Sequence, residues 1–349
     1  MINQITENNF INSLVKNLSR SSLQINKVHE SDAEIIRLYE NSNDYLAITT
    51  DSIVEEIKTG LYDDPYLIGW MSVMVNLSDL AAVGSKPLGV LVSEILPSNY
   101  SLNDIEKLQS GISDACKMCN TFILGGDTNT GDNLIITGTA LGYLTNKKYV
   151  SRIGLQNNDI LYSTGFIGRG NAFAISRFFN KTSLKFNYLP AAKIKEAGIL
   201  KNYASACMDT SDGVISTLDQ LMRLNNKGFL LNKDWESKLD KDSSKLANSY
   251  AIPLWLLLAG YHGEFELLFT IPQKTESEFL MKANEIKWTP VKLGIVINEP
   301  KIKIPLYGKI TEIDSTRIRN LSSQLENGIN LYLKSLLAID NEIRDNRES

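Results

Sequence analysis

Aspartates are the residues of this sequence whose type and placement most clearly allow chemistry. Six of them stand among small or hydroxyl-bearing neighbours: Asp32, Asp51, Asp79, Asp127, Asp209 and Asp212. A single aspartate at an element boundary is usually a helix cap or a turn former. As a set they supply carboxylate oxygens, which bind Mg²⁺ together with the oxygens of phosphate groups. The set therefore indicates a site for a magnesium-bound phosphate compound.

Two of these aspartates are placed in an unusual way. Asp79 lies inside a helical pattern of apolar residues, where aspartate is disfavoured and a buried charge is costly unless it is paired or metal-bound. Asp127 belongs to the segment Gly-Gly-Asp-Thr, which follows an apolar stretch and predicts a carboxylate presented at a strand's end. Both are therefore candidate metal ligands.

Other phosphate-binding patterns are weak or absent. The sequence has no Walker pattern, G-x-x-x-x-G-K-[ST], and no kinase H-R-D set, which excludes a P-loop and a protein-kinase type of nucleotide site. The segment 165–170, Gly-Phe-Ile-Gly-Arg-Gly, leads into an expected helix whose N-terminus could hold an anion. A plain turn explains this glycine pattern better.

The cysteines do not indicate a redox or zinc centre. There are three, at positions 116, 119 and 207, which is no disulfide framework and favours a reducing compartment. A full zinc site needs about four ligands, and the only histidines are His29 and His262. Two packed helical cysteines therefore explain Cys116 and Cys119 better than zinc binding or thiol chemistry.

The elements that must position the aspartates are of mixed type. In the first part we expect strands at 45–50, 87–96, 121–124 and 134–144, and helices at 65–83 and 101–120. After residue 149 we expect strands at 159–164, 229–231, 266–271 and 291–296, and helices at 171–179, 214–224, 275–286 and 321–339. The polar stretch 233–249 reads as a solvated excursion. The mixed order fits an α/β or an α+β fold, and periodicity alone does not decide between them.

Length and charge narrow the class of protein. The 349 residues predict two domains, 1–148 and 149–349, and the 36 basic and 40 acidic residues give a charge of −4. A mildly acidic chain has no general attraction for nucleic acid or an anionic membrane, so we expect a small-molecule substrate. The N-terminus lacks signal-peptide features, and no apolar run reaches the roughly 18–20 residues of a membrane span. We therefore expect a cytoplasmic protein.

Five motifs in order carry a family resemblance. They are segment 63–87, which contains Asn-Leu-Ser-Asp-Leu-Ala-Ala, and the segments Leu-Gly-Gly-Asp-Thr at 124–128, Tyr-Val-Ser-Arg-Ile-Gly at 149–154, Met-Asp-Thr-Ser-Asp-Gly at 208–213 and Gly-Glu-Phe-Glu-Leu-Leu-Phe-Thr at 263–270. In order and spacing they closely resemble thiamine-monophosphate kinase over roughly residues 25 to 300. The larger superfamily also holds aminoimidazole ribonucleotide synthetase, selenophosphate synthetase and the hydrogenase maturation dehydratase.

The resemblance implies a fold, a cofactor and a site. The fold would be the two-domain aminoimidazole ribonucleotide synthetase type, an α/β domain at the N-terminus followed by an α+β domain. N-terminal strands of two subunits would form a β-barrel in a homodimer, with ATP bound near it. By motif position, the six aspartates would hold Mg²⁺ ions on the ATP phosphates, with Asp212 and Asp127 taking part in catalysis. The further residues implied to bind the nucleotide are Arg152, Ser211, Gly125, Gly126 and Thr50.

The sequence departs from the family pattern mainly in the motifs that contact the acceptor substrate. Where the family has a pair of acidic residues at its first acidic site, this chain keeps one carboxylate, Asp32. The family's substrate-side histidine aligns with Lys58. The segment Gly-Gly-Glu-Asp-Tyr-Glu reads Tyr-His-Gly-Glu-Phe-Glu at 261–266, and the family's C-terminal histidine is missing. These changes predict an acceptor other than thiamine phosphate, with Lys58 and Glu264 as candidate substrate contacts. An exposed loop lysine explains Lys58 equally well.

Three functions are consistent with these residues. The first is an ATP- and Mg²⁺-dependent kinase for a small molecule. The second is an ATP-dependent ligase or cyclase that activates an amide or carboxylate oxygen. The third is a nucleotide-binding relative without turnover, which the retained aspartates disfavour, because unused acidic clusters repel one another. The cysteine-dependent activities of the superfamily are disfavoured because their N-terminal or C-terminal cysteines are absent.

Overall fold

The computed structural model describes residues 4–146, 148–179, 186–322 and 329–348. Its first half holds a five-stranded sheet in the order β1-β2-β5-β3-β4, antiparallel except for the β3–β4 pair. The strands are β1 (Glu34–Arg37), β2 (Tyr45–Ser52), β3 (Lys86–Pro97), β4 (Ile123–Gly131) and β5 (Ile135–Leu144). The helices are α1 (Thr6–Val15), α2 (Val54–Lys58), α3 (Pro65–Ala82) and α4 (Leu102–Met118).

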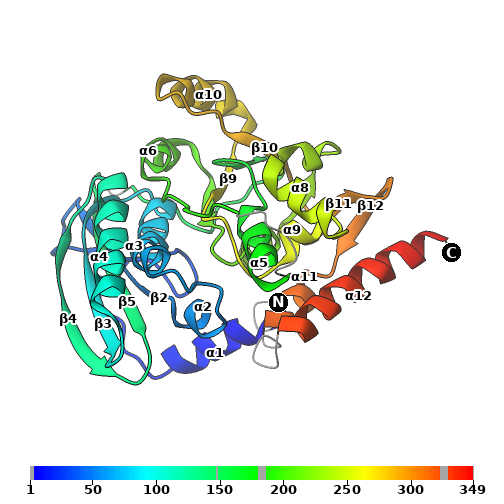
Figure 1. Ribbon diagram of the computed structural model, residues 1–349. Helices are drawn as coiled ribbons and strands as arrows, with labels where there is room; N and C mark the ends of the chain where they lie inside the picture. Colours follow the sequence, from blue (N-terminus) through cyan, green and yellow to red (C-terminus); the bar gives the residue numbers. More distant parts are fainter. Residues whose placement is uncertain (1–3, 147, 180–185, 323–328, 349) are drawn as a thin grey trace.

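Helices α3 and α4 lie beside this sheet and against each other (Figure 1). Helix α3 begins where the Asp64 carboxylate accepts a hydrogen bond from the backbone N–H of Tyr66, as the sequence predicts. It ends before Gly84, whose φ of +75° favours glycine. The two helices touch through their backbones, because a Cβ at Gly69 would lie 2.0 Å from the carbonyl oxygen of Leu108. This close contact fixes the position of α3.

The second half holds a seven-stranded sheet in the order β12-β11-β8-β10-β6-β9-β7, in which only β8 and β11 are parallel. The strands are β6 (Ile160–Ser163), β7 (Ala206–Asp209), β8 (Gly228–Leu231), β9 (Leu267–Ile271), β10 (Val291–Ile297), β11 (Ile302–Leu306) and β12 (Lys309–Ile313). The α-helices are α5 (Arg169–Phe179), α6 (Ile194–Tyr203), α7 (Val214–Asn225), α8 (Lys241–Ser249), α9 (Leu256–Ala259), α10 (Glu276–Glu285), α11 (Ser315–Asn320) and α12 (Ile329–Glu348).

Helix α3 packs against both halves of the molecule. Leu77 and Leu80 belong to the apolar core of the first half. Ala81 and Ala82, which directly follow Leu80, pack in a separate core with Phe269 of β9. Asp79 belongs to the same turn of α3. The buried length of α3 therefore brings its aspartate to the seam between the halves.

Two expectations of element type prove wrong. The expected strand at 121–124 continues as β4 to Gly131, so that the Gly-Gly-Asp-Thr segment pairs with β3 and forms no turn. The polar stretch 233–249 is no solvated excursion, since it forms a short 3₁₀ helix (Trp235–Lys238) and then α8. Trp235 is 1% exposed and donates a hydrogen bond to the carbonyl of Pro305. One buried aromatic thus outweighs the polarity of its neighbours.

The helix expected at 321–339 is present over residues 329–339, as part of α12. Helix α11 ends at Asn320 and α12 begins at Ile329, and residues 323–328 lie outside the described part of the chain. Within the described residues, no helix combines the length and apolar character needed to cross a membrane. The mixed fold that the resemblance implies is present as two sheets with their helices, whereas a domain boundary at residue 149 stays a prediction.

Candidate active site

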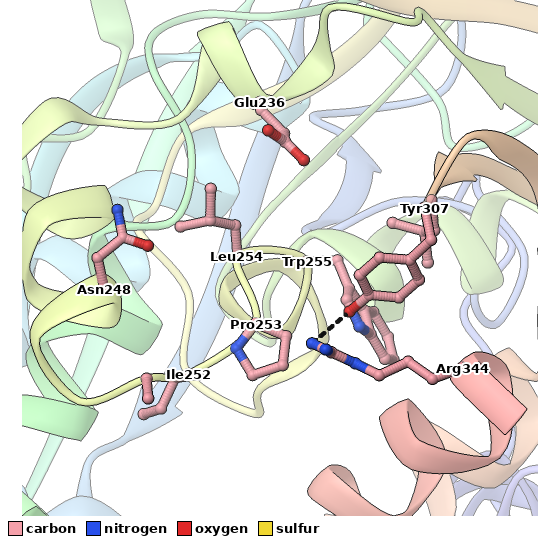
Figure 2. A pocket seen from close by; sticks show the side chains of 10 residues that line it. Glu236, Asn248, Ile252, Pro253, Leu254, Trp255, Tyr307 and Arg344 are labelled. Atoms are coloured by element: carbon pink, nitrogen blue, oxygen red, sulfur yellow. Dashed lines mark hydrogen bonds between the residues drawn. The ribbon is translucent and has the colours of Figure 1, made fainter.

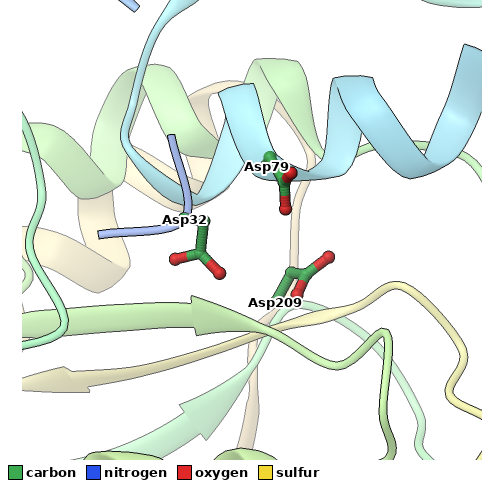
Figure 3. Close-up of side chains that lie close together, drawn as sticks. All are labelled: Asp32, Asp79 and Asp209. Atoms are coloured by element: carbon green, nitrogen blue, oxygen red, sulfur yellow. The ribbon is translucent and has the colours of Figure 1, made fainter. Parts of the chain in front are cut away.

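Three of the predicted aspartates meet at the seam between the two sheets. Carboxylate oxygens of Asp32, Asp79 and Asp209 all lie within 4.8 Å of one another, as Figure 3 shows. Asp32 comes from the loop before β1, Asp79 from α3, and Asp209 is the last residue of β7. The side chain of Asp32 and the whole of Asp209 are each only 1% exposed. Three elements that are distant in sequence thus build one acidic cluster.

Hydrogen bonds from neighbouring hydroxyls orient two of the carboxylates. Thr49 Oγ1 donates to Asp79 at 2.6 Å, and Ser78 Oγ donates to Asp209, also at 2.6 Å. Ser211 Oγ donates to the other oxygen of Asp209 at 3.0 Å. Sequence analysis missed Thr49 and Ser78, although Ser78 directly precedes Asp79 and Thr49 stands two positions before Asp51. These bonds leave part of each carboxylate free to bind a cation.

One carboxylate oxygen of Asp32 binds a cationic side chain, whereas the other has no partner among the described residues. Arg152 donates to Asp32 Oδ1 at 2.9 Å, and the backbone N–H of Arg152 donates to the carbonyl of Glu30 at 2.8 Å. The buried Asp32 Oδ2 has no hydrogen-bond partner in the part of the chain that the structure describes. Such an oxygen is costly to bury unless something positive binds it.

The electrostatics of the cluster favour a further positive charge. Burial raises the pKa of Asp79 well above its ordinary value, and the nearby Asp209 and Asp32 raise it further. Burial and Asp32 raise the pKa of Asp209 to about 6. Three carboxylates face one guanidinium, that of Arg152, whose pKa Asp32 raises. A divalent cation would offset the excess negative charge, and Mg²⁺ prefers such an all-oxygen donor set.

The other predicted ligands lie around this cluster or apart from it. Asp212 follows in the same turn as Asp209, and its pKa is raised to about 8 by burial and by Glu7 and Asp209, against Arg319. Asp51 stands near the end of β2 and contributes to the raised pKa values of Asp79 and Asp212. Neither belongs to the cluster, but both face the same acidic region.

Asp127 lies on the outer face of the first sheet. Its partner across the β3–β4 ladder is Ser93, which is exposed and pairs in turn with Thr137 of β5. Asp51 and the buried Val92 lie together in the neighbouring row of paired residues across the sheet. Side chains of adjacent rows point to opposite faces of a sheet, so Asp51 and Asp127 lie on opposite faces. The Asp127 carboxylate accepts a hydrogen bond from Asn129 at 2.7 Å. The described residues therefore do not bring Asp127 into the cluster.

The predicted nucleotide contacts are also divided. Arg152 and Ser211 touch the cluster directly through Asp32 and Asp209. Thr50 donates to the carbonyl of Gly138 on the neighbouring strand. Gly125 and Gly126 are exposed on β4, where a Cβ at Gly126 would lie 1.9 Å from the carbonyl oxygen of Val92. Their nucleotide roles stay predictions.

Lys58 and Glu264, the predicted substrate contacts, occupy different environments. Lys58 is the exposed last residue of α2. Glu264 is buried, and its Oε2 accepts hydrogen bonds from the backbone N–H groups of Gly168 at 3.1 Å and Gly170 at 3.5 Å. The Glu264 carboxylate thus occupies the N-terminus of α5. The glycine-rich turn before α5 is accordingly filled by the protein's own side chain rather than left open to an external anion.

This buried carboxylate makes folding stability depend on pH. Burial, with a contribution from Glu266, raises the pKa of Glu264 from 4.5 to about 8. A group whose pKa is raised by folding contributes its full stability below its unfolded pKa and loses it as the pH rises through the folded pKa. We expect the free energy of unfolding to fall from pH 5 to pH 9 by on the order of a few kcal/mol more than in Glu264→Gln. Denaturant titrations across this pH range measure the difference.

The exposed Glu278 on α10 offers the matched control. Glu278→Gln removes the same charge without touching α5, and its stability curve should follow that of the unmodified chain. Parallel curves for Glu264→Gln and the unmodified chain would mean that folding does not raise the pKa of Glu264.

A separate cavity of about 300 Å³ lies between the chain before α9 and helix α12. Figure 2 shows the Arg344 guanidinium beside the Tyr307 ring, over which it lies at 4.6 Å from the centroid. Both side chains also bind the buried Asp340, at 2.7 Å and 2.5 Å. The charge of Arg344 is therefore already compensated, and none of the predicted site residues lines this cavity.

Comparisons with known proteins decide the family. Residues 30–144 match the family model of the AIR synthase related protein, N-terminal domain. A thiamine-monophosphate kinase of Buchnera aphidicola subsp. Schizaphis graminum is 32% identical over 326 residues, which cover 89% of this chain and 93% of that protein. The chain belongs to the thiamine-monophosphate kinase family. The enzyme of Methanocaldococcus jannaschii is 33% identical over 281 residues, which cover 74% of this chain and 84% of that protein.

Solved structures agree in fold. AaThiL complexed with AMPPCP and TMP superposes with a TM-score of 0.71 at 20% identity, covering 89% of this chain and 98% of that chain. The hydrogenase maturation protein HypE of E. coli gives 0.67 at 17% identity, with 88% and 98% covered. The predicted superfamily fold is thereby confirmed.

Family membership identifies the chain as a kinase-like enzyme, an ATP-dependent phosphotransferase. In its general form, as an ATP-dependent phosphotransferase, the first of the three functions consistent with the sequence is confirmed. The ligase and the silent relative find no support in these comparisons, and neither does an acceptor different from that of the relatives.

Proposed function

We propose that this enzyme transfers the γ-phosphoryl group of ATP to thiamine monophosphate in a Mg²⁺-dependent reaction. The observation that carries the proposal is the cluster of Asp32, Asp79 and Asp209, built at the seam of a thiamine-monophosphate kinase fold. Phosphoryl transfer depends mainly on positioning and on neutralisation of charge, which metal-bound carboxylates supply. This acceptor replaces the different one that the departures in sequence predict.

The cluster fits a magnesium ion on the chemistry of its donors. Among the described residues, Asp32 Oδ2 is buried without a hydrogen-bond partner, and burial and neighbouring carboxylates raise the pKa values of Asp79 and Asp209. These three carboxylates would hold the ion, which would neutralise charge on the ATP phosphates. Arg152 fixes the orientation of Asp32, and Ser78 and Ser211 fix that of Asp209. Asp51, Asp127 and Asp212 remain candidates for further ions.

The acceptor side of the site is strongly acidic. The pKa of Tyr261 is raised first by the carboxylate of Asp212, then by burial and by Glu55, Glu7 and Glu56. Burial raises the pKa of Glu56 to about 7. Carboxylates in this number suit a cationic acceptor, and the thiazolium ring of thiamine monophosphate is a cation. Lys58, exposed at the end of the helix that carries Glu55 and Glu56, would face the acceptor's phosphate.

Phosphorus NMR of a complete reaction tests the proposal. With ATP, Mg²⁺ and thiamine monophosphate, we expect ADP and thiamine diphosphate to appear in equal amounts without free phosphate. Free phosphate released in step with ADP would instead indicate ligase chemistry. Turnover that appears only with another phosphate monoester in place of thiamine monophosphate would restore the prediction of a different acceptor.

A homodimer is part of the proposal, because the family resemblance implies a β-barrel between two subunits. The edge of the first sheet supports it with apolar side chains exposed by 39–70%: Leu88, Leu91, Phe122, Ile123 and Leu124. Contiguous apolar surface of this kind usually marks a protein interface.

We therefore expect sedimentation equilibrium to give twice the chain mass of 39.0 kDa. Phe122→Asp should shift the equilibrium towards the monomer by at least about tenfold, because it would bury a charge in the interface. Met281→Asp on α10, where Met281 is 57% exposed, is the matched control and should leave the mass unchanged. A monomer at all concentrations of the unmodified chain would refute the dimer.

A further inference from the structure

A buried polar network lies behind the acidic cluster. The hydroxyl of Tyr62 and Nε2 of His262 are 3.3 Å apart, and the ring centroid of Tyr188 lies 5.2 Å from that of His262. The three residues are 1%, 7% and 4% exposed. The ring of Phe173 stacks on Tyr188 at 4.4 Å and lies 6.2 Å from that of Tyr62. The network thus joins the first half of the chain, through Tyr62, to the second.

This network ends on the backbone of Gly263. The hydroxyl of Tyr188 donates to the carbonyl of Gly263 at 2.7 Å, while the N–H of Gly263 donates to the carbonyl of Ser211 at 2.9 Å. A Cβ at Gly263 would lie 1.3 Å from the carbonyl oxygen of Thr210, so no other residue fits this contact. Ser211 lies between Asp209 and Asp212. The loop that carries His262 therefore rests directly on the turn that carries the two aspartates.

The same loop is fixed at both of its ends. The N–H of His262 donates to Asn171 Oδ1 at 3.2 Å, and Asn171 Nδ2 donates to the carbonyl of Leu257 at 2.8 Å. At the other end, the carbonyl of Glu266 accepts from the N–H of Thr210 at 2.9 Å. A loop held in this way transmits a change at His262 to the aspartate-bearing turn.

We infer that Tyr62, His262 and Tyr188 are positioning residues that set the separation between Asp79 and Asp209. Tyr62 lies just before α3, which carries Asp79. Tyr62 contacts His262, and Tyr188 binds the loop that carries His262. The Asp209 turn rests against this loop. A displacement of either part would change the distance between two carboxylates that must share one ion. The inference rests on the proposed metal site and adds to that site residues that would not contact the ion.

Binding of Mn²⁺, measured by electron paramagnetic resonance of the full-length protein, tests this inference without any acceptor. Tyr62→Phe keeps the ring and removes the hydroxyl on which the network centres. Changes in residues that orient metal ligands typically cost about 10- to 100-fold in affinity, and we expect a loss of at least about tenfold here. The melting temperature of the metal-free protein is recorded for each variant.

Tyr162→Phe is the matched control. Tyr162 is 2% exposed, and its hydroxyl donates at 2.6 Å to Glu276 at the start of α10, not to the loop that carries His262. It should bind Mn²⁺ as the unmodified chain does, even if its melting temperature falls as far as that of Tyr62→Phe. Equal Mn²⁺ affinities in Tyr62→Phe and the unmodified chain would overturn the inference.

His262 provides a second, independent pair of variants. His262→Gln places an amide near the position of Nε2 and should retain most of the Mn²⁺ affinity, whereas His262→Leu should lose it as Tyr62→Phe does. Equal losses in the two variants would contradict a role of the hydrogen bond. Failure of the proposed metal site is distinguishable, because then the unmodified chain itself would not bind Mn²⁺, and the inference would fall with it. A different acceptor, seen by phosphorus NMR, would refute the proposed function and leave the Mn²⁺ result in place.

Discussion

Asp79→Asn should lower the rate of phosphoryl transfer by about a hundredfold to a thousandfold, the loss typical of one electrostatic contact to a transition state. Asparagine keeps the shape of the side chain and can still accept the hydrogen bond from Thr49. It removes one of the three negative charges that would hold the metal ion. The measurement is the initial rate of ADP formation at saturating ATP and Mg²⁺.

The same substitution should leave the metal-free protein as stable as before, or make it more stable. The pKa of Asp79 is raised in the folded state by burial and by Asp209 and Asp32, so its ionised form opposes folding. A carboxyl with a raised pKa stabilises the fold only while it is protonated. The gain from Asp79→Asn should therefore be clear near pH 7 and vanish as the pH falls towards 3.8, the ordinary pKa of the group.

Asp114 on α4 serves as the control for both effects. It is an exposed aspartate that is bonded to Tyr66 and Lys117, remote from the cluster, and Asp114→Asn should leave turnover unchanged. A lowered melting temperature with intact turnover in Asp79→Asn would mean that Asp79 is a scaffold residue and no metal ligand.

Arg152→Met should destabilise the metal-free protein by about 3–5 kcal/mol, the usual cost of removing one partner of a buried ion pair. Asp32 is 1% exposed at its side chain, and Arg152 is 17% exposed. Without the guanidinium, the three carboxylates would face one another without the cation that pairs with Asp32. Chemical denaturation followed by circular dichroism measures the change.

A double-mutant cycle separates lost charge from lost packing. Asp32→Asn in the Arg152→Met background should recover much of the stability, because the uncompensated charge has gone. Mg²⁺ should also recover part of it in Arg152→Met alone, by replacing the missing positive charge. Strictly additive effects of the two substitutions would show that Arg152 acts through its packing.

Local signals allowed the elements around the site to be predicted well. The cap at Asp64, the glycine at position 84 and the apolar run between them predicted α3 to within one residue at its C-terminus. An aspartate inside that helix was a sound indication of a charged site. The three clustered aspartates were all in the predicted set. Asp79 and Asp209 stand in motifs that the family shares, and Asp32 is the carboxylate that remains of the family's acidic pair.

Features that depend on distant contacts escaped sequence analysis. Strands β1, β11 and β12 and helix α8 carry weak local patterns and are defined by their partners. The approach of Glu7 to Arg319, 312 positions apart, leaves no local trace, yet both residues alter the pKa of Asp212. The length of β4 was misjudged because glycine and aspartate usually end strands, whereas pairing with β3 overrides that tendency here.

The most direct test of the proposed metal site is anomalous diffraction from crystals grown with Mn²⁺ and a non-hydrolysable ATP analogue. We expect a strong anomalous peak within coordination distance of Asp32, Asp79 and Asp209, with phosphate oxygens of the nucleotide completing the coordination shell. Bound nucleotide without a manganese peak at these three carboxylates would contradict the proposed site, as would a peak held only by other residues.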